Sequence, residues 1–377
     1  MSIGGKRILV TGSQGFIGRN LVTRLGEIEP VEIVHFDRGD DPAVLPDLVV
    51  EADAIVHLAG ENRPKDERAY AEVNEGLTVS LCNAVRQVRS GNVRSVPLVL
   101  ASSAQVELDN PYGRSKLAAE KAVQSLADET GNPCIVFRLP GVFGKWGRPN
   151  YNSVVATFCH NIARGTPIRI SDPSKVLRLV YIDDLADAVL AALDTPTTGF
   201  NFAYVSPEYT VTLGELAAQI EAFEAGREQL RVEHVGAGLG RALYATYISH
   251  LPPTRFVYDI PRHHDERGVF IEMLKTPDSG QFSYFTAGPG ITRGGHYHHT
   301  KSEKFLVIKG KALFRFRHLV TNERLEIITS GDAPQVVETI PGWSHDVTNI
   351  GTEELAVMLW ANEVFDRDQP DTIAAKV

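Results

Sequence analysis

Short apolar runs alternate with amphipathic stretches over roughly the first 200 residues, a pattern typical of βαβ units around a parallel sheet. The apolar runs predict strands at Arg7–Thr11, Glu32–Phe36, Ala54–Leu58, Leu98–Ser102 and Cys134–Leu139. The stretches between them predict helices at Phe16–Leu25, Val73–Val88 and Ser115–Asp128. We therefore expect an α/β fold here, a doubly wound parallel sheet of the Rossmann type.

From about Phe256 the pattern changes to short β-rich runs separated by glycine and proline turns. These runs predict an all-β barrel or jelly roll. Adjacent prolines resist both helix and central strand, so Pro252 and Pro253 mark the best boundary. We expect one domain over residues 1–251 and a second over 252–377. The β-rich runs include Lys304–Ile308, Ala312–Arg317, Arg324–Ile328 and Ala356–Trp360.

Composition and charge narrow the classes of partner. The 377 residues are 43% hydrophobic and carry a net charge of -9, which argues against nucleic acid because phosphate binding needs a concentrated basic surface. The three cysteines are few, odd in number and without metal-type spacing, which indicates buried reduced thiols and a cytoplasmic protein. No signal-peptide core and no apolar run of membrane-spanning length is present, so we expect neither export nor membrane insertion.

A glycine-rich turn follows the first predicted strand and opens the first predicted helix. Glycines at 12, 15 and 18 of Thr11–Gly18 permit a tight turn, close approach of a pyrophosphate and tight packing of helix on sheet. The pattern alone also fits a plain tight turn, and its position between strand and helix favours a dinucleotide site. Beyond the second strand, Asp37 suits the ribose hydroxyls of NAD and Arg38 the extra phosphate of NADP, so both cofactors stay open.

A phenol and an ammonium lie four residues apart in Tyr112-Gly113-Arg114-Ser115-Lys116, at the start of a predicted helix. This spacing puts both on one face, where the cation would lower the pKa of the phenol and help it to protonate a carbonyl oxygen. Ser103 ends a strand upstream and could bind the same oxygen, with Ser102 as its competitor. A surface pair is the plain alternative for this common spacing.

A cluster of metal-ligand side chains lies in the second half. His296 and His298 share one face of a predicted strand, and Glu303 follows on the next strand. The segment fits the cupin first motif, G-x5-H-x-H-x4-E-x6-G, from Gly290 to Gly310. His345 resembles the ligand of the second cupin motif, although Pro341 precedes Gly342 directly. Three imidazoles and a carboxylate suit one divalent metal, with zinc preferred over iron, nickel or manganese, and a metal-free cupin is the alternative.

Together, the glycine turn, serine, tyrosine and lysine resemble the extended short-chain dehydrogenases/reductases. The resemblance implies that Ser103, Tyr112 and Lys116 are catalytic and that Arg138, Asn152 and Arg178 lie beside a sugar nucleotide. It implies a cofactor site formed by Gly12, Gln14, Gly15, Phe16, Ile17, Gly18, Asp37, Arg38, Asp53, Leu58, Ala59, Tyr112 and Lys116.

The fusion of the two signatures resembles bifunctional capsular-polysaccharide enzymes, on segments such as Pro149–Val154, His298–Lys301 and Val364–Asp366. This resemblance implies that UDP-2-acetamido-2,6-dideoxy-β-L-arabino-4-hexulose is epimerised at C3 in the cupin. NADPH-dependent reduction at C4 would then give UDP-2-acetamido-2,6-dideoxy-L-talose, a precursor of N-acetyl-L-fucosamine for surface polysaccharide. It also implies a homodimer or higher homo-oligomer. Two alternatives stay open: a one-step ketosugar reductase with a structural cupin, and a non-catalytic NAD(P) sensor.

Overall fold

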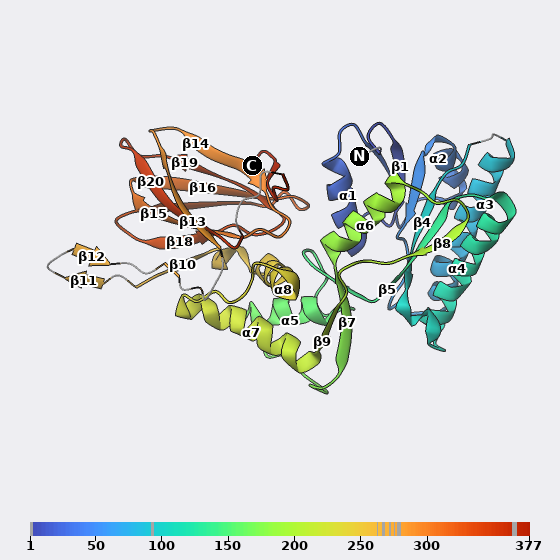
Figure 1. The fold of residues 1–377 in the computed structure, drawn as a ribbon, viewed down its shortest axis with the longest axis horizontal. Helices are drawn as coiled ribbons and strands as arrows, with labels where there is room; N and C mark the ends of the chain where they lie inside the picture. Colours follow the sequence, from blue (N-terminus) through green and yellow to red (C-terminus); the bar gives the residue numbers. More distant parts are fainter. Residues whose placement is uncertain are drawn as a thin grey trace. The chain divides into compact units, whose positions relative to one another are not determined.

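The computed structural model describes residues 3–91, 94–261, 263–265, 268–270, 273–274, 276, 280–363 and 368–377 (Figure 1). It divides into two compact units. The first comprises residues 1–143, 151–153 and 177–210, and the second residues 144–150, 154–176 and 211–377. The division into domains of residues 1–251 and 252–377, which the sequence indicates, stays a prediction.

The first unit is built on a six-stranded parallel sheet in the order β2-β1-β3-β4-β5-β8. The register places Val10 beside both His35 and Val56, so the strand ends are aligned at one edge. The strands are β1 Arg7–Thr11, β2 Glu32–Phe36, β3 Ala54–His57, β4 Leu98–Ser103, β5 Cys134–Leu139 and β8 Phe200–Ala203. The predicted doubly wound parallel sheet is confirmed.

Helices pack on both sides of this sheet. Leu81, Val85 and Val123 belong to the buried core formed by α2, α3 and α4 with the sheet, while α1 packs with α6. The helices are α1 Phe16–Gly26, α2 Leu45–Glu51, α3 Leu77–Gly91, α4 Pro111–Thr130 and α6 Ile182–Asp194, with short turns η1 Pro42–Val44 and η3 Ala104–Glu107 and a π-helical segment η2 Tyr70–Gly76. All three cysteines are buried and free, as expected.

The second unit contains two five-stranded sheets. One has the order β10-β18-β15-β20-β13 and the other β17-β16-β19-β14-β21, with antiparallel pairing. Phe305 of the first sheet packs on Phe314 of the second, with ring centroids 5.6 Å apart, so the apolar core lies between the sheets. This arrangement confirms the predicted all-β barrel.

The strands of the second unit are β10 Val257–Asp259, β13 Gln281–Ala287, β14 Thr292–Tyr297, β15 Glu303–Lys309, β16 Lys311–His318, β17 Arg324–Ser330, β18 Gln335–Glu338, β19 Trp343–Asn349, β20 Leu355–Ala361 and β21 Ile373–Ala374. A separate hairpin pairs β11 His263–Asp265 with β12 Gly268–Phe270. The helices are α5 Val154–Ile162, α7 Leu213–Gln229, α8 Gly238–Ser249 and the turn η4 Pro253–Arg255. A small sheet of β6 Gly141–Phe143, β7 Val176–Tyr181 and β9 Tyr209–Thr212 consists mostly of residues of the first unit. Within the described residues, every helix is too short or too polar to cross a bilayer.

Candidate functional site

The glycine turn between β1 and α1 has no room for side chains at its key positions. Gly12 has a φ of +72°, and a Cβ there would lie 2.7 Å from the backbone nitrogen of Ala59. A Cβ on Gly18 would lie 2.2 Å from the carbonyl oxygen of Gly12. The turn therefore needs glycine at both positions, and it leads directly into the N-terminus of α1, where Phe16 and Ile17 begin the helix. A helix N-terminus that follows such a turn can hold a pyrophosphate.

Two side chains beyond β2 lie at this turn. The Asp37 carboxylate accepts hydrogen bonds from the Ser13 hydroxyl and from the backbone nitrogen of Gln14, the latter at 3.0 Å. Arg38 is ion-paired with Glu61, while 85% of its side chain stays exposed. Asp37 therefore stabilises the turn itself, and Arg38 offers an accessible cation beside it.

The end of β3 also reaches the turn, whereas its beginning does not. Leu58 donates its backbone hydrogen bond to Thr11 at 3.0 Å, and Ala59 lies against Gly12. Asp53 precedes the same strand, and its carboxylate accepts from the backbone of Arg7 at 2.8 Å and from Arg94 at 2.8 Å. Asp53 thus lies at the amino edge of the parallel sheet, opposite the turn. The structure does not support the expected contact of Asp53 with the cofactor, because ligands of such sheets bind at the carboxyl edge.

Ser103, Tyr112 and Lys116 meet at the carboxyl edge of the sheet. Ser103 is the last residue of β4, and Tyr112 lies in the first turn of α4, whose start is fixed by the Asn110 side chain accepting from Gly113 at 2.7 Å. Ser103 and Tyr112 are hydrogen-bonded through their side chains. The buried amine of Lys116 donates to the carbonyl oxygen of Ala101 at 2.9 Å. The geometry thus pairs Ser103 with Tyr112 and places Lys116 one turn further along α4, and a shared catalytic role of the three residues stays a prediction.

Burial governs the electrostatics of this site. It raises the pKa of the Tyr112 phenol, and the hydrogen bond with Ser103 opposes that increase. The expectation that Lys116 lowers the pKa of Tyr112 below its ordinary value is therefore wrong here. Burial also lowers the pKa of Lys116 to about 8, although the Glu120 carboxylate favours the charged amine. With a pKa of about 8, the Lys116 amine is mostly charged at neutral pH and loses its proton at slightly higher pH.

Ser102, the competing serine, has a different partner. Its hydroxyl donates to the buried carboxylate of Glu120 at 2.5 Å, and the same carboxylate accepts from Arg138 at 2.7 Å. The Arg138 guanidinium also lies 4.5 Å from the ring centroid of Phe202. Ser102 and Arg138 therefore belong to one hydrogen-bond network around Glu120. If Arg138 binds substrate, it does so while it is paired with Glu120.

The other two expected substrate contacts are more accessible. Arg178, on β7, is ion-paired with Glu208 at 2.5 Å, and 63% of its side chain is exposed. Asn152 is exposed in the segment before α5. Neither is brought against the Ser103 and Tyr112 pair by a contact among the described residues.

Asn74 is a site residue that the sequence reasoning missed. It lies in the π-helical segment η2, is 2% exposed, and its side chain accepts from the backbone of Glu61 at 2.7 Å. Its amide also donates to Ser115 at 3.0 Å, next to Lys116 in α4. Asn74 therefore ties the loop after β3 to the helix that carries the tyrosine and lysine. In the sequence, Asn74 is only one of several polar residues in the helix predicted at Val73–Val88, and nothing in the pattern marks it as buried.

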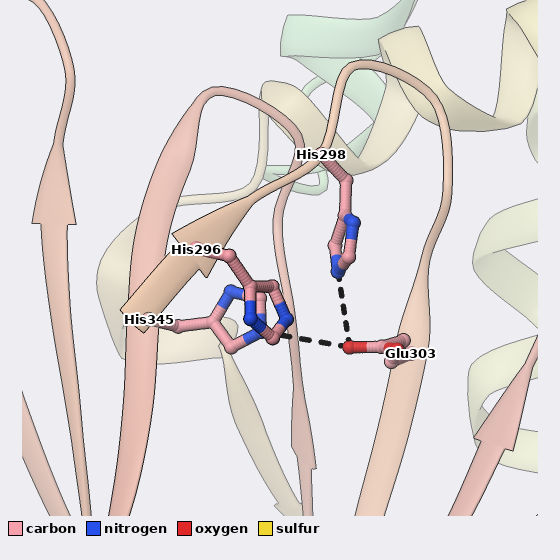
Figure 2. A group of neighbouring side chains, drawn as sticks. All are labelled: His296, His298, Glu303 and His345. Carbon is pink, nitrogen blue, oxygen red and sulfur yellow. Dashed lines mark hydrogen bonds and ion pairs between the residues drawn. The ribbon is translucent and has the colours of Figure 1, made fainter. Parts of the chain in front are cut away.

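The four predicted metal ligands converge in the second unit (Figure 2). His296 comes from β14, His298 follows that strand, Glu303 begins β15 and His345 lies on β19 opposite His296. One ligand atom from each side chain lies within 4.8 Å of the others. The glutamate lies between two of the histidines, with Oε2 3.1 Å from His298 Nε2 and 3.5 Å from His345 Nε2.

The charges and hydrogen bonds of this cluster suit a cation. Burial, together with the neighbouring imidazoles of His345 and His298, lowers the pKa of His296 to about 3. Burial alone would raise the pKa of Glu303, but His298 and His345 hold it well below its ordinary value. The Nε2 of His345 is buried and faces Oε2 of Glu303 at 3.5 Å. Neutral imidazoles with free nitrogen lone pairs and an ionised carboxylate are the donor set that a divalent metal requires.

Two family models match the chain. One is described as the NAD dependent epimerase/dehydratase family and matches residues 8–205. The other is the polysaccharide biosynthesis C-terminal domain and matches residues 263–373. The chain is also 24% identical to the UDP-glucose 4-epimerase of Vibrio cholerae, over 57% of this chain and 75% of that protein.

Other relatives cover nearly the whole chain. It is 53% identical to the UDP-2-acetamido-2,6-beta-L-arabino-hexul-4-ose reductase of Pseudomonas aeruginosa, over 98% of this chain and 99% of that protein. The crystal structure of the capsular polysaccharide assembling protein CapF from Staphylococcus aureus is 38% identical, covers 98% of this chain and 100% of its own, and gives a TM-score of 0.65. These matches confirm the expectation of an enzyme. The chain therefore belongs to the NAD-dependent epimerase/dehydratase family and, within it, to the group of CapF and the Pseudomonas aeruginosa reductase.

Proposed function

We propose that the chain converts UDP-2-acetamido-2,6-dideoxy-β-L-arabino-4-hexulose to UDP-2-acetamido-2,6-dideoxy-L-talose. The proposed route is epimerisation at C3 in the barrel, followed by reduction at C4 in the Rossmann unit. The observation that carries the reduction is the hydrogen bond between Ser103 and Tyr112 beside buried Lys116, at the sheet edge that also bears the glycine turn. The 53% identity to the UDP-2-acetamido-2,6-beta-L-arabino-hexul-4-ose reductase of Pseudomonas aeruginosa supports this choice of substrate.

Tyr112 is the proposed proton donor in the reduction. A bound nicotinamide cofactor supplies the hydride that adds to C4. As negative charge develops on the C4 oxygen, Tyr112 donates its phenolic proton, and Ser103 hydrogen-bonds the same oxygen. The charged form of Lys116 stabilises the tyrosinate that remains. The raised pKa of Tyr112 keeps the phenol protonated before the reaction.

NADPH is the proposed cofactor. Arg38 presents an exposed guanidinium beside the turn, where a 2′-phosphate would bind, and arginine suits phosphate because its planar group forms paired hydrogen bonds. The Asp37 carboxylate is already satisfied by Ser13 and Gln14. An aspartate held in this way has less capacity left for the ribose hydroxyls that NAD would offer.

The barrel is the proposed site of epimerisation. The C4 ketone makes the C3 hydrogen acidic, so removal of that proton and its return on the other face inverts C3. His296, His298, Glu303 and His345 would hold the divalent metal, for which zinc is our choice. Such a metal supplies a Lewis acid that favours the enolate. Reduction of the epimer at C4 would draw the reversible C3 step forward.

Product analysis tests this function. The full chain would be incubated with the UDP-linked 4-keto-6-deoxy sugar and NADPH, and the product followed by NMR. An L-talo product formed with one NADPH consumed per sugar supports both steps. Cofactor oxidation that leaves C3 unchanged would instead indicate a one-step reductase with a structural barrel. Absence of turnover with either cofactor would favour a nucleotide-binding protein.

We also propose that the chain forms a cytoplasmic homo-oligomer. Its product would be a precursor of N-acetyl-L-fucosamine for surface polysaccharide.

A further inference from the structure

The loop between two of the proposed metal ligands is held by a residue far along the chain. Residues 299–302 connect His298 to Glu303, and the carboxylate of Asp371 accepts hydrogen bonds from the backbone nitrogens of the first three, 299–301. The distances are 2.8 Å to His299, 2.7 Å to Thr300 and 2.7 Å to Lys301. The Thr300 hydroxyl adds a fourth hydrogen bond at 3.0 Å. Because only 12% of the Asp371 side chain is exposed, little water competes for these contacts.

The backbone of Asp371 reaches a ligand directly. Its carbonyl oxygen accepts a hydrogen bond from Nδ1 of His298, whose Nε2 lies 3.1 Å from Glu303. A proton fixed on Nδ1 leaves the lone pair of Nε2 directed into the cluster. The side chain of Asp371 therefore fixes the loop, and its carbonyl fixes the ring orientation and tautomer of His298.

The residues after Asp371 continue this contact along the cluster. Strand β21 pairs with β14 and places Ala374 opposite His296, and Ala375 donates to the carbonyl oxygen of Gly295 at 2.9 Å. The Ser344 hydroxyl, next to His345, donates to the carbonyl oxygen of Lys376 at 3.2 Å. The last residues of the chain thus lie beside the elements that carry three of the four ligands.

We propose that Asp371 is a positioning residue of the metal centre, which holds His298 and the 299–301 loop in the geometry that binds the metal. This inference rests on the proposed metal site and concerns binding of the metal, whatever reaction the barrel performs. Outer hydrogen bonds of this kind contribute on the order of 10- to 100-fold to metal affinity. The Asp371→Asn substitution keeps the size of the side chain, but it replaces one acceptor oxygen with a donor that faces backbone N–H groups.

The test is the zinc affinity of the full chain, measured by competition with a chromophoric chelator. We expect one zinc per wild-type chain, weaker binding of about 10-fold or more in Asp371→Asn, and an altered visible spectrum of its cobalt(II) form. The matched control is Asp368→Asn, an exposed acid on the same segment, which should bind zinc as the wild type does. Thr300→Val removes the hydroxyl, which contacts both Asp371 and Arg241, but keeps the three backbone hydrogen bonds to Asp371. It should therefore give a smaller loss, which provides a second reading if Asp371→Asn folds poorly.

Each outcome separates the proposals. Equal zinc affinity and an unchanged cobalt spectrum in folded Asp371→Asn would overturn the positioning role and leave the metal site standing. A wild-type chain that binds no zinc at this cluster would overturn the metal site and the positioning role together. Zinc binding that depends on Asp371 in a chain without C3 epimerase activity would support the positioning role and contradict the proposed function.

Discussion

The hydroxyl of Ser102 donates to Oε1 of Glu120 at 2.5 Å, which commits this serine to the network with Arg138. Ser103 is hydrogen-bonded to Tyr112 instead. We therefore expect Ser103→Ala to lower the kcat of reduction by about 100-fold, since it removes a donor to the developing oxyanion. Ser102→Ala should mainly lower the free energy of unfolding, by about 1–3 kcal/mol, because a buried carboxylate loses a partner. Steady-state kinetics and denaturant unfolding of both variants check this, and the reverse pattern would contradict it.

Tyr112→Phe should lower the kcat of reduction by about 100- to 10,000-fold, because it removes the proposed acid while keeping the ring. The matched control is Tyr70→Phe. The ring of Tyr70 lies 5.9 Å from that of Tyr112, but its hydroxyl donates to the backbone of Asn62. NADPH oxidation by the two variants checks the prediction, and similar losses in both would count against a specific role of Tyr112.

Lys116 should make the rate of the reduction fall at high pH. Burial lowers its pKa to about 8, so its ammonium is present below that pH and is lost as the pH rises through it. We expect kcat/KM for the ketosugar to fall above about pH 8, because the cation no longer stabilises the tyrosinate. The same shift means that the unfolded chain binds more protons between about pH 8 and 10.5, so this group makes the free energy of unfolding rise with pH there. A rate that stays constant to about pH 10 would contradict the role of Lys116.

Arg38→Ala should weaken NADPH far more than NADH. Loss of a charge-assisted contact with phosphate costs about 1.5–3 kcal/mol, which corresponds to a rise in the KM for NADPH of roughly 10- to 100-fold. The KM for NADH should change little, because NADH lacks the 2′-phosphate. Arg324→Ala, an exposed arginine of the barrel, serves as the control. An equal effect on both cofactors would remove the argument for NADPH.

Five of the six strands of the parallel sheet were predictable because each is a compact apolar run, whereas the edge strand β8, Phe200–Ala203, was not predicted. Glu32–Phe36 and Cys134–Leu139 are observed with the expected bounds. The helix expected at Ser115 begins earlier, at Pro111, because Asn110 caps it, and the helix expected at Val73 begins as the π-helical segment η2. Hydrophobic periodicity carries little information about caps or about a change of helical type.

The convergence of the four candidate ligands in the barrel could be predicted because their spacing is local, apart from His345. The residues that hold the two sites in place through hydrogen bonds could not be predicted. Glu120 bonds residues 18 positions away on two strands, and Asp371 bonds a loop about 70 positions earlier. Such contacts depend on tertiary packing, which spacing along the chain does not encode. The misplacement of Asp53 has a related cause, since an aspartate before a strand and one after it lie at opposite edges of a parallel sheet.

Separation of the two reactions tests the central claim most directly. Tyr112→Phe, loaded with zinc, would be incubated with the UDP-linked 4-ketosugar in heavy water without cofactor, and the recovered sugar examined by NMR and mass spectrometry. We expect deuterium at C3 of the recovered sugar, and its loss when His345→Ala is added, because the C3 step needs the barrel cluster and not the phenol. Recovery of the sugar without deuterium at C3 would contradict the claim that this chain is an epimerase as well as a reductase.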